Sequence, residues 1–260
     1  MFSDIRGFTP ISEQYKTDPQ GLTSLINRFL TPMTDLLMDR RGTIDKYMGD
    51  CIMAFWNAPV NVDEHEKQAV ESALEMVDRL DELNVELVGE GKMPIKIGIG
   101  INTGEVVVGN MGSNNRFDYS ILGDAANLAS RLEGQSKGYG VTIILGEETA
   151  TAVNNELFNI ELDKIAVKGK KDAIRIFTVL GNNDWVFKNT NWYFNQQQHD
   201  KFLVLYRQQS WESAELFAND LRASWPEMAG YYGMMIDRIR EYKENPPGDS
   251  WDGVYRAETK

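Results

Sequence analysis

The chain has 260 residues, of which 39 are acidic and 27 are basic, so its net charge is −12. An acidic chain is not attracted to phosphate backbones, and nucleic acid is therefore not an expected partner. Hydrophobic residues (42%) and charged residues (25%) have the balance of a globular chain with a buried core, which excludes disordered and fibrous classes. The single cysteine, Cys51, cannot form an internal disulfide, and no apolar run is long enough to span a membrane, so a cytoplasmic setting is expected.

A segment rich in turn-forming residues divides the chain. The hydrophobic run over 174–180 ends in Gly181, Asn182, Asn183 and Asp184, which predicts a domain boundary near residue 182. Beyond it lie five of the six tryptophans but only four of the 22 glycines, so the glycine-dependent turns belong almost entirely to the first part. We therefore expect two domains, residues 1–182 and residues 183–260.

The first domain alternates between helical and strand-like spacing of apolar side chains, which is typical of an α+β or α/β layer architecture. Its expected elements, in chain order, are a helix over 20–41, strands over 43–47 and 51–56, a helix over 63–88, strands over 95–101 and 105–109, a helix over 124–135, and strands over 141–145, 158–167 and 173–180. Gly49 and Asp50 predict a hairpin between the first two strands, and Asn102, Thr103 and Gly104 predict another between the next two.

The second domain is expected to be helical, with helices over 195–208, 210–223 and 226–243. Its pattern of Leu203, Tyr206, Trp211, Ala214 and Phe217 is similar to one helix pair of a tetratricopeptide array. Because a lone pair of such helices rarely buries enough surface to be stable, we expect this extension to pack on the first domain or on a second subunit.

Two acidic residues, Asp4 and Asp50, lie at or beside predicted strand ends. Carboxylates on a rigid sheet can converge on hard divalent cations, with phosphate oxygens completing the shell; the alternative is that each acid caps a turn. Gly7, Phe8 and Thr9 follow Asp4 closely, and a tight glycine turn exposes backbone N–H groups to an anion. The two acids and the glycine turn together suggest a site for a divalent metal and a polyphosphate.

The helix over 124–135 begins at Asp124, a good N-cap type, and carries Asn127 and Arg131 four residues apart on one face. Arg131 is either a surface charge or a clamp for a phosphoryl group. Lys168 and Lys170 lie at a predicted hairpin tip, which is usually a solvated cationic turn. Residues 107–112, VVGNMG, read as a structural turn.

Four motifs occur in order within residues 1–182, namely FSDIRGFT, KYMGD, GDAANLASR and VKGK. Together they resemble the catalytic domain of class III nucleotidyl cyclases, the adenylyl and guanylyl cyclases. The resemblance implies a ferredoxin-like α+β palm that works as a homodimer, with each catalytic site built across the subunit interface. The reaction it implies is conversion of ATP into 3′,5′-cyclic AMP and pyrophosphate.

The resemblance makes Asp4 and Asp50 the carboxylate ligands of two Mg²⁺ or Mn²⁺ ions per site, with the backbone carbonyl of Ile5 as a further ligand. It makes Gly7, Phe8 and Thr9 the turn that cradles phosphates. A two-ion arrangement activates the ribose 3′-hydroxyl and holds the terminal phosphates during in-line displacement of pyrophosphate.

On the opposite subunit, the resemblance assigns Asn127 to orienting the ribose and Arg131 to the charge that builds on the α-phosphoryl oxygens. Lys168 matches the lysine that reaches the terminal phosphates, and Lys170 stays an alternative to it. Lys46 and Ser120 match the base-selecting positions.

Adenine offers an acceptor at N1 and a donor at N6, so a donor at Lys46 and an acceptor at Ser120 favour ATP over GTP. Guanine would call for an acid in place of Lys46. Many family members carry Asp where this chain has Ser120, while a subgroup with Thr or Ser there is suspected of sensitivity to bicarbonate, which stays a hypothesis for this chain.

The family's first strand usually begins several residues before the FSDIRGFT motif, whereas the motif here begins at residue 2. We expect a catalytic fragment of a longer protein, whose preceding region holds a sensor or a membrane anchor. Two rival functions are a guanylate cyclase and a catalytically silent cyclase-like module that binds a nucleotide or a partner. The presence of Asp4, Asp50, Asn127 and Arg131 disfavours the silent module.

Overall fold

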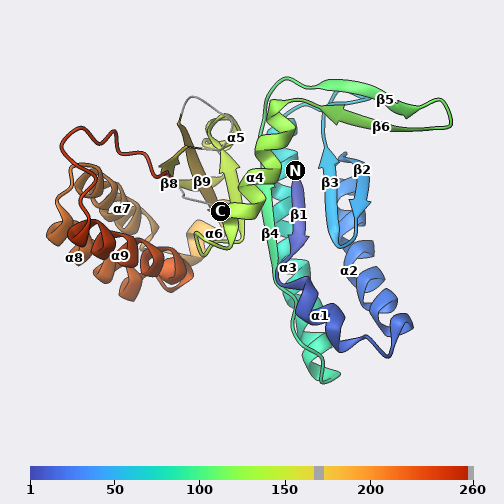
Figure 1. The fold of residues 1–260 in the computed structure, drawn as a ribbon, viewed down its shortest axis with the longest axis horizontal. Helices are drawn as coiled ribbons and strands as arrows, with labels where there is room; N and C mark the ends of the chain where they lie inside the picture. Colours follow the sequence, from blue (N-terminus) through green and yellow to red (C-terminus); the bar gives the residue numbers. More distant parts are fainter. Residues whose placement is uncertain (167–172, 257–260) are drawn as a thin grey trace.

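The computed structural model describes residues 1–166 and 173–256. Its main sheet has seven strands in the order β2-β3-β1-β4-β7-β9-β8, and β5 and β6 form a separate two-stranded sheet (Figure 1). The strands are β1 (Phe2–Ile5), β2 (Thr43–Met48), β3 (Cys51–Phe55), β4 (Ile97–Ile101), β5 (Val107–Ser113), β6 (Arg116–Leu122), β7 (Ile143–Gly146), β8 (Phe158–Ile165) and β9 (Ile174–Gly181). Among these described strands, only β4 and β7 pair in parallel, and the other pairs of the main sheet are antiparallel. The central strand is β4, with β1 and β7 on either side.

Nine α-helices and a short 3₁₀ turn lie within the described residues. They are α1 (Phe8–Gln14), α2 (Pro19–Asp39), α3 (His65–Gly89), α4 (Asp124–Ser136), α5 (Glu147–Val153), α6 (Asn183–Lys188), α7 (Trp192–Arg207), α8 (Trp211–Ser224), the 3₁₀ turn Pro226–Met228 and α9 (Ala229–Glu244). The long helix over 20–41 is confirmed with Pro32 inside it, as are the helix over 63–88 and the three helices predicted for the extension.

Side-chain alternation along the central strands divides the core between two faces of the sheet. Ile99 of β4 and Ile143 of β7 belong to the buried cluster that contains α2 and α3. Ile144, the next residue of β7, belongs to the cluster that contains α4 and the C-terminal helices. Because successive residues of a strand point to opposite faces, both faces of the sheet are covered by helices.

Two glycines in β4 set the distance between the sheet and α4. A Cβ atom at Gly100 would lie 2.1 Å from the carbonyl oxygen of Ala129, and one at Gly98 would lie 2.4 Å from Ser136 Oγ. The helix backbone therefore rests directly on this strand, at a separation that larger residues would prevent. This close contact fixes the position of the helix that carries Asn127 and Arg131.

The predicted hairpin over 95–109 is wrong. β4 pairs with β1 and β7, while β5 pairs with β6 in an arm that projects beyond the main sheet (Figure 1). Asn102 does not close a turn, because its side-chain amide donates to the carbonyl oxygen of Ala125 at 3.1 Å and holds the chain against the start of α4. The turn predicted over 107–112 is likewise part of a strand, β5.

Smaller differences concern short elements. The helices α1, α5 and α6 and the strand β6 have no counterpart in the prediction. Asp124 is the first residue of α4 rather than its N-cap, which is Gly123. Its carboxylate still lies in the first turn, where a negative charge is favoured by the helix dipole.

The C-terminal extension packs on the first part of the chain, the first of the two expected arrangements. One buried cluster joins Leu128, Leu132 and Ile160 to side chains of α7, α8 and α9. The last described segment also reaches the sheet, because Tyr255 N–H donates to the carbonyl oxygen of Lys164 at 2.8 Å, beside the end of β8. The boundary near residue 182 and the tetratricopeptide likeness stay predictions. Over the ranges 1–166 and 173–256, no helix has both the length and the apolar character of a membrane span.

Candidate active site

The two acids predicted to bind metal lie next to each other. Asp4 is in β1, and Asp50 is in the turn that joins β2 to β3, the strand that pairs with β1. Asp50 Oδ2 accepts a hydrogen bond from the backbone N–H of Ile5 at 3.2 Å. Burial, followed by the charge of Asp50 and a hydrogen bond with it, raises the pKa of Asp4 to about 6. Antiparallel pairing therefore concentrates negative charge at one point of the sheet.

These groups fit a hard divalent cation. Carboxylate oxygens are the ligands that Mg²⁺ and Mn²⁺ prefer, and a cation would offset both the burial and the repulsion by Asp50 that raise the pKa of Asp4. Within the part of the chain that the structure describes, no group of three or more His, Cys, Asp or Glu side chains could hold a metal. Further ligands would therefore come from the backbone, such as the predicted carbonyl of Ile5, and from phosphate oxygens of a bound nucleotide.

The turn after β1 has the backbone conformation expected of a glycine. Gly7 has φ +67° and ψ +38°, in the left-handed region, and Phe8 and Thr9 open α1, whose first turn has no side-chain cap. The preceding residue anchors this turn, because the Arg6 guanidinium donates to Ser136 Oγ at 3.1 Å and to the carbonyl oxygen of Val141. Arg6 thereby ties the predicted phosphate turn to the end of α4.

A third acid lies near the pair and has no role in the sequence-based prediction. Glu133, on α4, is half-buried; burial, followed by the charge of Asp4, raises its pKa to about 7, while Arg6 opposes the shift. The signal that could have found it is its position two residues after Arg131, which turns it to the sheet side of the helix.

Asn127 and Arg131 share one exposed face of α4, and Leu128 and Leu132 are buried on the other. In the described part of the chain, neither polar side chain makes a hydrogen bond or an ion pair. The structure thus brings Asp4 and Asp50 together. It leaves Asn127 and Arg131 exposed to solvent, where a second molecule could contact them.

The two predicted base-selecting residues are linked by a third. Ser120 Oγ donates to Asp45 Oδ2 at 2.6 Å, and Lys46 Nζ lies 3.1 Å from Asp45 Oδ1. Lys46 comes from β2 and Ser120 from β6, so the arm and the main sheet meet at Asp45. Lys168 and Lys170 lie outside the described residues, and the choice between them stays a prediction.

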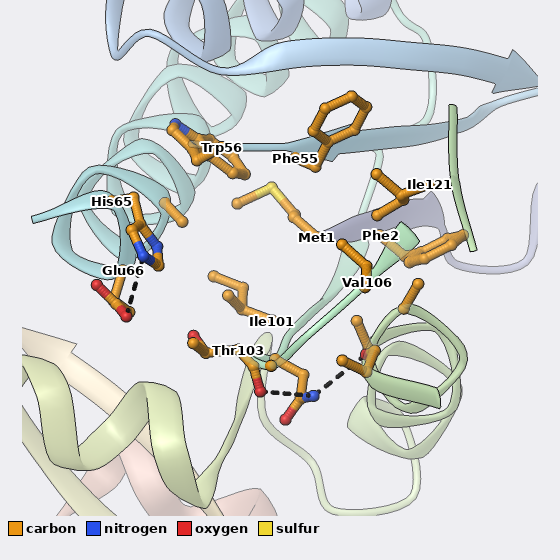
Figure 2. A pocket seen from close by; sticks show the side chains of 16 residues that line it. Met1, Phe2, Phe55, Trp56, His65, Glu66, Ile101, Thr103, Val106 and Ile121 are labelled. Carbon is orange, nitrogen blue, oxygen red and sulfur yellow. Dashed lines mark hydrogen bonds and ion pairs between the residues drawn. The ribbon is translucent and has the colours of Figure 1, made fainter. Parts of the chain in front are cut away.

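A cavity at the other end of β1 is distinct from the acidic pair. It is lined mainly by apolar side chains, among them Phe2, Phe55, Ile101 and Ile121, as Figure 2 shows. Its volume is about 100 Å³, below the roughly 300 Å³ at which ligand pockets usually begin. It is too small for a nucleotide, and neither Asp4 nor Asp50 lines it.

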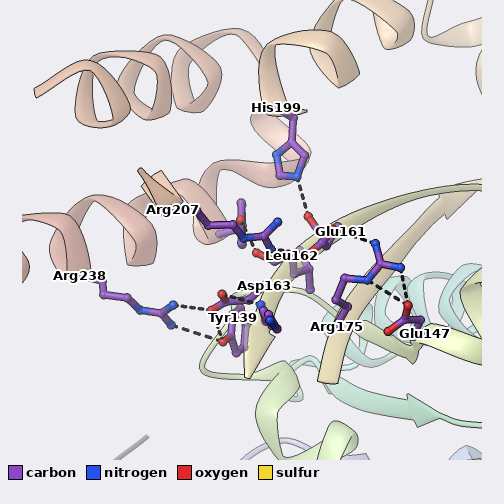
Figure 3. Close-up of polar contacts among 11 residues, drawn as sticks. Tyr139, Glu147, Glu161, Leu162, Asp163, Arg175, His199, Arg207 and Arg238 are labelled. Atoms are coloured by element: carbon purple, nitrogen blue, oxygen red, sulfur yellow. Dashed lines mark hydrogen bonds and ion pairs between the residues drawn. The ribbon is translucent and has the colours of Figure 1, made fainter. Parts of the chain in front are cut away.

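The buried charged cluster between the sheet and the C-terminal helices is structural. Arg238 of α9 pairs with Asp163 of β8, which also accepts from Tyr139 Oη at 2.6 Å (Figure 3). His199 Nδ1 lies 2.9 Å from Tyr232 Oη, and burial lowers the pKa of His199 to about 4. Each charge is balanced inside the protein, so this cluster joins the two parts of the chain instead of offering a site.

Solved cyclase structures share this fold. The adenylyl cyclase CyaB from P. aeruginosa superposes with a TM-score of 0.65 at 35% identity, covering 70% of this chain and 92% of that one. The guanylyl cyclase Cya2 superposes with a TM-score of 0.63, also at 35% identity, covering 70% and 91%. The predicted α+β cyclase fold is confirmed, but a fold shared by both kinds of cyclase does not decide between ATP and GTP.

Curated relatives of this chain are also named as cyclases. "Adenylate cyclase 1" of Rhizobium meliloti (strain 1021) is 32% identical over 181 residues, and the adenylate cyclase of Anabaena cylindrica is 38% identical over 186 residues. These matches cover 70% and 69% of this chain but only 27% and 36% of the relatives, so the chain spans about a third or less of their length. The family model of the adenylate and guanylate cyclase catalytic domain matches residues 1–181, and the chain belongs to that family.

Proposed function

We propose that this chain is the catalytic part of an adenylate cyclase, which converts ATP into 3′,5′-cyclic AMP and pyrophosphate at the interface of a homodimer. The observation that carries the proposal is the pairing of Asp4 with Asp50 beside the glycine turn, on a fold that catalyses this class of reaction in related proteins. The two named adenylate cyclase relatives support the choice of product.

Asp4, Asp50 and the carbonyl of Ile5 would hold two Mg²⁺ or Mn²⁺ ions. When bound, such ions lower the pKa of a hydroxyl nucleophile and neutralise phosphate charge. Gly7, Phe8 and Thr9 form the turn that opens α1 soon after Asp4, and their backbone N–H groups would donate to phosphate oxygens. Lys168 or Lys170 would reach the terminal phosphates.

Asn127 and Arg131 would act on the nucleotide bound to the partner subunit. Their exposure and their lack of partners in the described residues support a role across an interface. The Asn127 amide can orient the ribose, and the planar Arg131 guanidinium can bind two oxygens of the α-phosphoryl group as their charge increases. A homodimer built this way has two equivalent sites.

Lys46 and Ser120 would select adenine. The Lys46 ammonium can donate to N1, and the Ser120 oxygen can accept from the N6 amino group. Guanine has a donor at N1 and an acceptor at O6, so both contacts would be mismatched. Because the chain is 35% identical to both an adenylyl and a guanylyl cyclase, the fold leaves the base open, and we assign the choice to these two residues.

The test is product formation by purified protein with Mn²⁺ and either ATP or GTP, measured against protein concentration. Cyclic AMP as the main product, with specific activity that rises with concentration, supports an adenylate cyclase that needs a dimer. Turnover of GTP to cyclic GMP above turnover of ATP would support a guanylate cyclase, and the Lys46→Glu variant then shows whether Lys46 sets the choice. Nucleotide binding with no product from either substrate would leave the silent module.

A further inference from the structure

Asp45 occupies an irregular position in β2. The strand pairs Ile44 with Ala54 and Lys46 with Met53, so Asp45 is an extra residue, a β-bulge without a partner in β3. In a regular strand, residues 45 and 46 would point to opposite faces of the sheet. The bulge breaks that alternation and lets the carboxylate of Asp45 lie within 3.1 Å of the ammonium of the next residue, Lys46.

The Asp45 side chain is completely buried and joins two sheets. Its Oδ2 atom accepts from Ser120 Oγ at 2.6 Å and from the backbone N–H of Ile121 at 3.3 Å, both on β6. Its Oδ1 atom has no hydrogen bond within the described residues, so the ammonium of Lys46 is the group that balances it. A buried carboxylate held by three donors fixes those donors in return.

This contact settles what the Ser120 hydroxyl can offer a ligand. A serine hydroxyl has one proton and two lone pairs, and a carboxylate has acceptors only. The Ser120 proton is therefore committed to Asp45, and the free side of its oxygen can only accept. A hydroxyl that would otherwise tolerate a donor or an acceptor becomes selective for a donor such as an exocyclic amino group.

We propose that Asp45 is a positioning residue for base recognition, which makes Ser120 an obligate acceptor and holds Lys46 as the donor beside it. The proposal rests on the proposed function, in which these two residues meet adenine. Many family members carry Asp at the position of Ser120. In this chain the negative charge comes instead from Asp45 on β2, which explains how a serine can select adenine there.

The experiment compares ATP and GTP in wild type, Asp45→Asn and the control Asp118→Asn. Asp118 is on β6, the strand of Ser120, but its side chain is 43% exposed and faces Arg116. The single oxygen of Asn cannot both accept from Ser120 and balance the ammonium of Lys46. We therefore expect Asp45→Asn to lower the ratio of kcat/KM for ATP over GTP by about tenfold or more, mainly through KM for ATP, because one lost selective contact is worth about that factor. Asp118→Asn should keep the wild-type ratio.

Coupling to Ser120 separates this role from a structural one. In a Ser120→Ala background, Asp45→Asn should change the ATP to GTP ratio by less than half as much, whereas general damage to the fold would lower turnover of both nucleotides equally in either background. Should Asp45→Asn fail to fold, Ser120→Ala and Ser120→Thr give the test: Ala should lose the preference and Thr, which keeps the hydroxyl, should retain it. A folded Asp45→Asn protein with the wild-type ratio, or a Thr variant without preference, overturns the proposal.

The same comparison by competition with a fluorescent nucleotide needs no turnover. If wild type forms no cyclic product yet binds ATP over GTP in an Asp45-dependent manner, the proposed function fails and the role of Asp45 stands. If wild type makes cyclic AMP and Asp45→Asn leaves both ratios unchanged, the role of Asp45 fails and the proposed function stands.

Discussion

Asp50 Oδ2 accepts a hydrogen bond from the backbone N–H of Ile5, the residue after Asp4, at 3.2 Å; burial, followed by the charge of Asp50, raises the pKa of Asp4 to about 6. A fold that keeps two acids in contact stores an unfavourable interaction, which a cation can relieve.

Saturating Mn²⁺ is expected to stabilise the wild-type protein, by about 2.7 kcal/mol at 100 times the dissociation constant. Asp4→Asn should melt at a higher temperature than wild type without metal at pH 7, because the repulsion with Asp50 is gone, and should show no shift with Mn²⁺ and no cyclase activity. Differential scanning calorimetry with and without Mn²⁺ measures both effects. Asp118→Asn is the control, and a full Mn²⁺ shift in Asp4→Asn would exclude the pair as the metal site.

Mixing two inactive variants should restore activity if sites are shared between chains. Asp50→Ala removes a metal ligand and Arg131→Ala removes the charge supplied by the partner, so a mixed dimer has one site with both defects and one intact site. We expect each variant alone to lose about 10²-fold or more in kcat and the mixture to recover up to about a quarter of wild-type activity. Native mass spectrometry identifies the mixed dimer, and its inactivity would argue for sites within one chain.

Gly100→Ala should destabilise the protein and reduce activity, because its Cβ would lie 2.1 Å from the Ala129 carbonyl oxygen and 2.2 Å from the Glu133 nitrogen. Relief of that clash moves α4 away from β4 and displaces Asn127 and Arg131, at a cost of about 1–3 kcal/mol. The matched control is Gly134→Ala on α4 itself. A Cβ atom at Gly134 would have no neighbour within 4 Å, and alanine is favoured over glycine in a helix by up to about 1 kcal/mol. Urea unfolding of both variants measures the difference, and equal stability would refute the close-contact role.

His199 should make stability depend on pH between about 4 and 6.5. Its pKa is lowered from 6.5 to about 4 by burial, so the unfolded chain binds the extra proton in this range and the folded chain does not. Its contribution is therefore fully present above pH 6.5 and is lost as pH falls towards 4, by about 3 kcal/mol in total.

The measurement for His199 is urea unfolding at several pH values in wild type and His199→Gln. The variant should be less stable at pH 7, because Tyr232 and the Glu161 carbonyl lose a matched partner, yet lose less stability on acidification. A parallel pH profile in both proteins would show that other groups dominate the acid sensitivity.

The sequence by itself determined the local elements and the chemistry they carry. The apolar repeat over 20–41, the Gly49-Asp50 turn and the motif around Asp4 depend on neighbouring residues, so they could be predicted without knowing what packs against them. The same is true of the family, since its motifs are short and contiguous. The hairpin over 95–109 failed because Asn102, Thr103 and Gly104 are turn-forming types whose partners, such as Ala125, lie far along the chain.

Tertiary structure alone decided which distant groups meet. Strand pairing, set by burial of both sheet faces, places Asp50 against the backbone of Ile5; the two glycines of β4 seat α4 and bring Glu133 close to Asp4. Likewise, only a bulge in β2 puts the Asp45 carboxylate between Lys46 and Ser120. Such contacts depend on register and on the close approach of backbones, and neither is encoded in any single segment.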